Sequence, residues 1–303
     1  MNAVDLPAKI RTTHKLCDLS QAMRRLAAAR RGQAVQLFSG LERYAEATRQ
    51  ALKQGLALWK SETVAATGPR LVVACLSEHG FVGSQNEMLL QTLVAVRAEK
   101  PAQVLLLGHR GRRYVTERGV PVDHFLNMPT TLSSVSQVAQ ELLQFLFQRI
   151  ERQQIQEVKV VFARPMGPAC FEPHAESLFP PPVQASEKTQ RPPVHSMPAR
   201  ELTALLIKEY VYAQVMWMIA SAFAAEQAAR FSAMDASVRK LQEQLSELRL
   251  LEQMERQDTI TNEILEVAAA TSLLLSSAAP VDGGDKTGGV AKPASVPNAR
   301  AHR

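Results

Sequence analysis

The sequence has 303 residues, enough for one large domain or two ordinary ones. Hydrophobic residues make up 46% of it and aromatic residues 5%, which excludes wholesale disorder and favours Ala- and Leu-rich helices over a β-sandwich. Its three cysteines show no CxxC spacing, which argues against a disulfide framework or zinc site and favours a reducing compartment. The most apolar runs, 211–225 and 267–280, are too short to span a membrane.

The net charge of +6 is unevenly distributed along the chain. Residues 1–60 hold 11 Lys and Arg against 4 Asp and Glu, whereas residues 201–271 hold 6 against 11. A basic arm alone would suggest nucleic-acid binding. The acidic segment weakens that inference, because the two ends of the chain can face each other.

The N-terminal segment, residues 1–62, is predicted to form one long helix, called here the N-terminal shaft helix. Leu16, Leu19, Met23 and Leu26 recur in steps of three and four, which indicates one apolar helical face. Such a face needs a partner, because a helix of this length would otherwise leave it in water.

Residues 201–271 supply the partner, a C-terminal shaft helix with the 3.5-residue spacing of a coiled coil over about five heptads. No Pro or Gly occurs from 199 to 279, so the helix can run on the order of 100 Å. The predicted coiled-coil seam includes Phe231, Val238, Leu241, Leu245 and Leu248. We therefore expect an antiparallel two-helix rod, and the alternative is two amphipathic helices packed separately on the central block.

Residues 69–165 are predicted to form a central α/β domain. The expected strands are 71–76, 104–107, 124–126 and 158–162, and the expected helices are 87–98, 110–118 and 133–152. This alternation predicts a Rossmann-like, mostly parallel sheet of about four strands. The proline-rich residues 166–200 are expected to be an extended connection, and residues 272–303 a disordered tail.

No motif predicts a catalytic, cofactor or metal site. The turn at 77–86 follows a strand and precedes a helix, as phosphate-binding turns do, but it lacks the full GxGxxG pattern. The chain has no GxxxxGK[ST] motif, no nucleophile elbow around Ser77 and His79, and no metal-ligand spacing among its histidines. A nucleotide-binding α/β enzyme and a basic coiled-coil adaptor for nucleic acid remain as alternatives.

Four segments resemble the gamma subunit of F-type ATP synthases. Residues 225–236, AEQAARFSAMDA, are similar to the family's SEHAARMxAMDxA box, and residues 256–267, RQDTITNEILEV, to its closing RQxxITxEIxEI box. Residues 77–86 are similar to its SDRGLCGxxN segment, and the N-terminal Lys9-Ile10 and 22–30 to its RI…AMxxVAxxK pattern.

The resemblance implies a central rotor-stalk subunit without a catalytic site, peripheral at the cytoplasmic face of the bacterial inner membrane. Its implied partners are the alpha, beta, epsilon and c subunits, with no nucleic acid and only indirect membrane association. The shaft would couple ion flow to conformational change at the beta subunits. The residues expected to contact the alpha/beta ring are Met23, Arg30, Glu226, Arg230, Met234, Arg256 and Gln257.

Several positions depart from the family pattern. Asp18 stands where Lys is typical, His79 where Arg or Lys is usual, and Gln253 where Asn is common. These departures suggest a divergent branch, such as the sodium-coupled bacterial synthases. They leave open whether those three positions keep the family's contacts.

Overall fold

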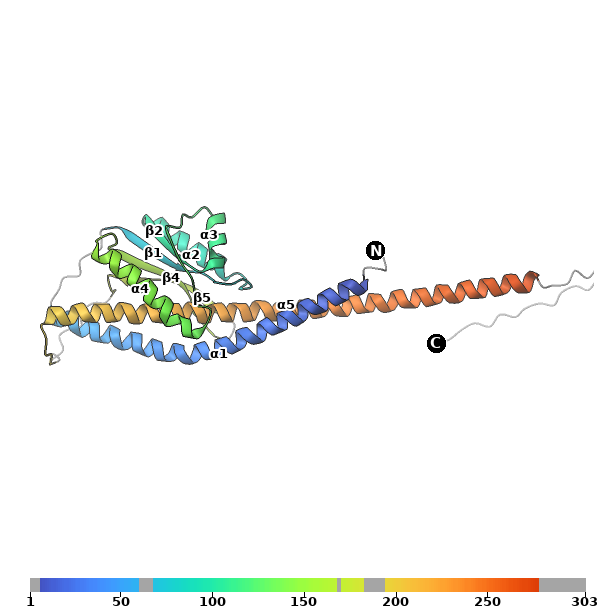
Figure 1. Cartoon of the computed structure of the whole chain (residues 1–303), viewed down its shortest axis with the longest axis horizontal. Coiled ribbons are helices and arrows are strands. Elements are labelled where there is room, and N and C mark those ends of the chain that lie inside the picture. Colours follow the sequence, from blue (N-terminus) through green and yellow to red (C-terminus); the bar gives the residue numbers. More distant parts are fainter. Residues whose placement is uncertain (1–5, 60–67, 168–169, 183–193, 278–303) are drawn as a thin grey trace, which may run out of the picture.

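A computed structural model describes residues 6–59, 68–167, 170–182 and 194–277. Two long helices, α1 (Leu6–Trp59) and α5 (Ala199–Ser277), lie side by side, and an α/β domain sits on them near one end of the rod (Figure 1). The elements between them are, in chain order, β1 (Arg70–Cys75), α2 (Gln85–Glu99), β2 (Ala102–Leu107), α3 (His109–Glu117), β3 (His124–Leu126), the 3-10 helix η2 (Leu132–Ser134), α4 (Val135–Glu151), β4 (Glu157–Pro165) and β5 (Phe171–Phe179).

The sheet has five strands in the order β3-β2-β1-β4-β5. Strands β3, β2, β1 and β4 run parallel to one another, and Val73 of β1 lies opposite Leu105 of β2 and Val160 of β4. The four parallel strands match the predicted ones. Strands β1, β2 and β4 are apolar runs that are largely buried, whereas the three residues of β3 are half-buried.

Strand β5 is the main feature that the sequence analysis missed, since it lies in the stretch expected to be an extended connection. It pairs antiparallel with β4, and its Pro173 is opposite Ala163. A proline is tolerated there because β5 is an edge strand, whose outer side has no ladder bond to make. The many prolines of this region therefore do not prevent a strand.

The two faces of the sheet bury separate sets of side chains. One face packs Leu71, Val73 and Phe162 against α4 and the paired shaft helices. The other face packs Val72 and Ala74 against the apolar side of α2 and Val115 of α3. Successive side chains of β1 therefore point to opposite faces of the sheet. The shaft packs on one face, and α2 and α3 pack on the other (Figure 1).

The shaft is antiparallel, as expected. Residues further along α1 contact residues earlier in α5. Three polar contacts record this pairing: Arg24 Nη1 donates to Asp235 Oδ1 at 2.8 Å, Gln214 Nε2 to the Ala45 carbonyl at 3.4 Å, and Thr203 Oγ1 to the Gly55 carbonyl at 3.0 Å. The first of these joins the basic and acidic segments of the chain.

The face that α1 buries differs from the predicted one. Leu16, Leu19 and Leu26 are exposed, and over residues 16–34 the buried positions of α1 hold small side chains, which are Cys17, Ser20, Ala27 and Ala34. Small residues let two helix backbones approach closely, and they displace the apolar stripe by one position around the helix. Over residues 16–26 the prediction for this face was wrong, because it followed the bulkiest apolar residues.

Helix α5 continues past the point where its partner α1 begins (Figure 1). Residues 256–273 are exposed at every position. The helix ends at Ser277, so residues 272–277 of the expected tail are helical, and the rest of that tail lies outside the described residues. Within the described ranges, no helix combines the length and apolarity that membrane spanning requires.

Candidate functional site

The turn after β1 is the place where the shaft, the sheet and α3 meet. This turn, residues 77–80, is called the hub turn below. Its neighbour Gly108 has φ +106, and a Cβ there would lie 2.4 Å from the Leu76 carbonyl oxygen. A Cβ on Gly111 would lie 2.2 Å from the Leu76 Cβ. Two glycines therefore allow α3 to pack directly on the chain entering the hub turn.

Ser77 and Asn86 close the hub turn from the α2 side. Asn86 Oδ1 accepts a hydrogen bond from the Ser77 backbone N–H at 3.0 Å, and its Nδ2 donates to Ser77 Oγ at 2.7 Å. Both residues are buried. The Ser77 hydroxyl is thus an acceptor in a structural pair, an arrangement that does not favour a nucleophile activated by His79.

Glu78 links the hub turn to the α3 side of the domain. Its Oε2 accepts hydrogen bonds from the backbone N–H of His109 at 3.1 Å and of Met128 at 2.8 Å. Its carbonyl accepts from the backbone N–H of Arg110 at 3.2 Å. One residue therefore holds the start of α3 and the segment after β3.

Glu226 of α5 binds the backbone of the hub turn. Its side chain is buried, and its two carboxylate oxygens accept from the backbone N–H groups of Glu78 and His79, each at 3.4 Å. Burial raises the pKa of Glu226, while Arg230 and the two backbone N–H groups oppose that rise. The carboxylate is compensated by an ion pair and by donors from a second element.

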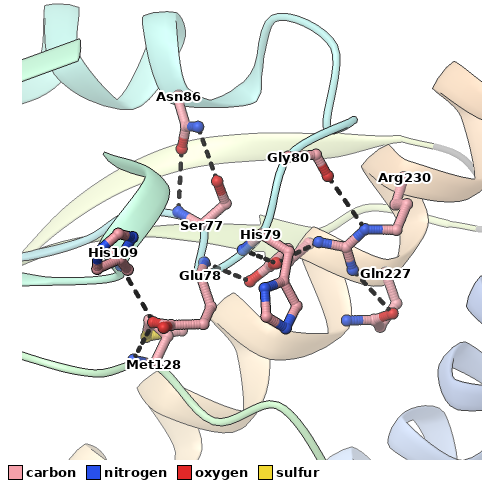
Figure 2. Close-up of polar contacts among 10 residues, drawn as sticks. Ser77, Glu78, His79, Gly80, Asn86, His109, Met128, Gln227 and Arg230 are labelled. Atoms are coloured by element: carbon pink, nitrogen blue, oxygen red, sulfur yellow. Dashed lines mark hydrogen bonds and ion pairs between the residues drawn. The ribbon is translucent and has the colours of Figure 1, made fainter. Parts of the chain in front are cut away.

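Arg230, one helical turn later, completes the clamp. Its Nη2 lies 2.5 Å from Glu226 Oε1, its Nη1 donates to Gln227 Oε1 at 3.1 Å, and its Nε donates to the Gly80 carbonyl at 3.3 Å. The side chain is only 6% exposed. Glu226 therefore accepts hydrogen bonds from backbone N–H groups of the hub turn. Arg230 donates to the Gly80 carbonyl of the same turn, as Figure 2 shows. Together the two residues join the shaft to the α/β domain.

The remaining predicted contact residues fall into two groups. Met234 is buried, and Met23 and Arg30 are half-buried along the paired part of the shaft. Arg256 and Gln257 are exposed on the unpaired part of α5. Burial of Glu226, Arg230 and Met234 inside this chain does not favour direct contact between their side chains and another subunit.

The predicted seam residues lie along the part of the shaft beyond the α/β domain. Val238 and Leu245 are buried with Cys17, and Leu241 and Ile10 pack against them. Phe231 and Leu248 are half-buried, and the Arg31 guanidinium stacks over the Phe231 ring at 4.9 Å.

Glu78, Asn86 and the two glycines at the start of α3, Gly108 and Gly111, had no predicted role. The signal available for the first two was the 77–86 box, which marked the turn but not what it binds. Among the departures, Asp18 pairs with His14 at 2.9 Å, His79 is exposed, and Gln253 is exposed. In the ranges that the structure describes, no group of three His, Cys, Asp or Glu residues is placed to hold a metal ion.

This geometry defines a class of protein: an antiparallel helical shaft that carries an α/β domain and is clamped to it at one turn. Comparison with known proteins gives the family. A family model described as ATP synthase matches residues 2–274. The ATP synthase gamma chain of Moorella thermoacetica is 25% identical to this chain, over 89% of this chain and 98% of its own length. The ATP synthase gamma chain of Desulforamulus reducens is 26% identical, over 90% of this chain and 99% of its own length.

Solved structures show the same fold. A chain of the Euglena gracilis mitochondrial ATP synthase rotor superposes with a TM-score of 0.60 at 13% identity, over 84% of this chain and 97% of its own length. A chain of the Tetrahymena thermophila mitochondrial central stalk and c-ring gives a TM-score of 0.55 at 15% identity, over 72% and 98%. The present chain belongs to the ATP synthase gamma chain family. It is a non-catalytic subunit, the central stalk of the rotor.

Proposed function

We propose that this chain rotates inside a ring of alternating alpha and beta subunits and couples ion flow through a membrane sector to conformational change at the beta subunits. The unpaired end of α5 is the observation that carries this proposal. Residues 256–277 extend about 33 Å as a single helix. A helix end exposed over that length needs a surrounding surface to be stable against fraying.

The exposed side chains of this end are apolar as well as charged. Ile260, Ile264, Leu265, Val267 and Leu273 are all more than half exposed. Large exposed apolar side chains gathered on one element mark an interaction surface. A close-fitting protein sleeve would cover them, and Arg256 and Gln257 at its entrance would make polar contacts.

Helix α1 presents a second apolar stripe near the same region. Leu16, Leu19 and Leu26 are about half exposed, and half-buried Met23 lies between them in sequence. The small residues of the helix pair turn this stripe outward, so it is available to another subunit. Met23 and Arg30 remain proposed ring contacts on this basis.

The α/β domain lies toward the opposite end of the shaft from the projecting helix (Figure 1). This placement supports a position outside the ring, against the epsilon subunit and the c subunits, at the cytoplasmic face of the bacterial inner membrane. The Tetrahymena neighbour was solved as a central stalk with its c-ring, which fits that arrangement. Membrane association is then indirect, and the coupling ion is set by other subunits.

Coupling requires that the shaft contact the states of the beta sites unequally, because a ligand shifts an equilibrium only by its differential affinity. Each charge crossing the membrane releases roughly 2.3 kcal/mol per 100 mV, so the shaft must pass on the work of several charges. Glu226 and Arg230 serve this role indirectly, since they fix the shaft to the domain that the c subunits would turn.

The test uses the complete synthase carrying Arg256→Glu, with Arg256→Lys as the matched control. We expect the reversed charge to lower ion-driven ATP synthesis while the subunit stays folded, because Arg256 is 73% exposed and pairs only with Glu252 in the described part of the chain. The conservative variant should keep most of the activity. Ion-driven synthesis by Arg256→Glu at the unaltered rate would contradict the proposal.

A further inference from the structure

A cavity of about 480 Å³ lies where α1, α5 and the β4–β5 edge of the sheet meet. Its lining includes Glu42, Arg49, Arg164, Glu176, Tyr210 and Trp217. It is separate from the hub turn, and no contact proposed for the alpha/beta ring lies in it. Its volume is in the range of small-molecule sites, and four elements, α1, β4, β5 and α5, contribute to it.

The ionic groups of the cavity are incompletely matched. Arg164 Nη2 lies 3.1 Å from Glu42 Oε1, and its guanidinium stacks over the Trp217 ring at 5.5 Å. Arg49 Nε lies 3.7 Å from Glu46 Oε2. Glu176, half-buried on β5, forms no ion pair with any residue that the structure describes. The cavity thus has a carboxylate available for a cationic group.

Two buried donors on the same lining lack acceptors. Neither Trp217 Nε1 nor Arg49 Nε, both buried atoms, has a hydrogen-bond partner among the described residues, although the Arg49 side chain is 40% exposed and its Nε faces Glu46 at 3.7 Å. Trp217 is only 6% exposed. A buried N–H group without an acceptor costs free energy, so its presence points to an acceptor supplied by a bound molecule. Burial also raises the pKa of Tyr210 above its ordinary value.

We propose that this cavity binds a small zwitterion, an amino acid carrying a free ammonium and a free carboxylate. The ammonium would pair with Glu176, and the carboxylate would accept from Arg49 and the Trp217 indole. A purely anionic ligand would leave Glu176 unmatched and add repulsion from the other carboxylates. A purely cationic ligand would leave both buried donors without acceptors. Since the ligand would bridge the shaft and the sheet, binding would stabilise the folded chain.

The experiment follows Trp217 fluorescence in the full chain carrying Trp59→Phe, because these are its two tryptophans. Each of the twenty standard amino acids is titrated in turn, and the tightest binder is compared with its N-acetyl and its amide derivatives. We expect saturable binding of at least one amino acid and affinities at least about tenfold lower for both blocked forms, since each loses a charge-assisted hydrogen bond.

Glu176→Gln should weaken binding of the same amino acid by about tenfold or more, whereas Glu172→Gln, an exposed carboxylate on the same strand, should leave it unchanged. Thermal unfolding in the presence of the amino acid gives a second readout, a concentration-dependent rise in midpoint that Glu176→Gln reduces. Absence of saturable binding for all twenty amino acids would overturn the proposal, as would equal affinity for the blocked forms.

Discussion

Arg230→Met tests whether the clamp between α5 and the hub turn stabilises the molecule as its geometry indicates. The substitution keeps an unbranched apolar stem and removes the guanidinium, with its charge and its donors. It leaves the buried Glu226 carboxylate without its ion-pair partner and the Gly80 carbonyl without its donor. Removing one member of a buried ion pair costs about 3–5 kcal/mol, because the remaining charge stays in a poorly solvated place.

The companion variants separate the charge from the packing. Glu226→Gln should cost less, about 1–3 kcal/mol, because Arg230 keeps the Gly80 and Gln227 acceptors. The double variant Glu226→Gln with Arg230→Met should be more stable than the sum of the two single losses predicts, since no buried charge is then unpaired.

The assay is urea unfolding of the full chain, followed by circular dichroism with a second probe to test for a two-state transition. The matched control is Arg256→Met, an arginine on the same helix that is 73% exposed and also pairs with a glutamate four residues away. It should change the free energy of unfolding by less than about 0.5 kcal/mol. A loss for Arg230→Met no larger than that of the control would show that the clamp does not stabilise the molecule.

Three further predictions concern the shaft and α3. Leu245→Ala should lower the free energy of unfolding by about 2–5 kcal/mol, because Leu245 is buried with Cys17 and Val238. The control Leu250→Ala, at an exposed position, should change it by less than about 0.5 kcal/mol. Equal losses for the two variants in denaturant unfolding would count against the seam. Gly111→Ala should destabilise the folded chain by about 1–3 kcal/mol, because the new Cβ would lie 2.2 Å from the Cβ of Leu76. Gly32→Ala, in open space on α1, should stabilise the folded chain by about 0.5–1 kcal/mol. Thermal unfolding that shows the opposite order would contradict this. Arg239 and Arg24 hold the pKa of Asp235 below its ordinary value. The Arg24–Asp235 ion pair should therefore be fully formed at any pH above that ordinary value, and it should be lost as the pH falls through the lower folded-state pKa. NMR titration should show a higher pKa of Asp235 in Arg24→Met, and an unchanged pKa would show that the two helices are not joined there.

The parts of the fold that depend on local pattern could be predicted from the sequence. The parallel strands are short apolar runs, and the shaft helices are long stretches with helical periodicity. Strand β5 could not be predicted in this way, because its half-buried residues alternate weakly and Pro173 is acceptable only at a sheet edge. Edge position is a property of the finished sheet.

The contacts of the shaft show a second limit. Leu16 and Leu19 have the stronger hydrophobic signal, yet Cys17 and Ser20 face α5, because close helix approach selects small side chains. At the hub turn, Glu226 and Arg230 stand in a box that the sequence analysis identified. Their burial depends on a turn nearly 150 residues earlier, so it could not be deduced from their own segment.

The pairing of the two ends as one rotating shaft is tested most directly by a disulfide within it. Ser20 Oγ and Ser237 Oγ are 3.5 Å apart across α1 and α5. Ser20→Cys with Ser237→Cys, in a chain whose native cysteines are replaced by Ala, is oxidised in the complete synthase, and ATP synthesis is measured before and after. We predict a high yield of cross-link and an unchanged rate, because both helices turn together; failure to cross-link, or a rate that falls in proportion to the cross-link formed, would contradict the account.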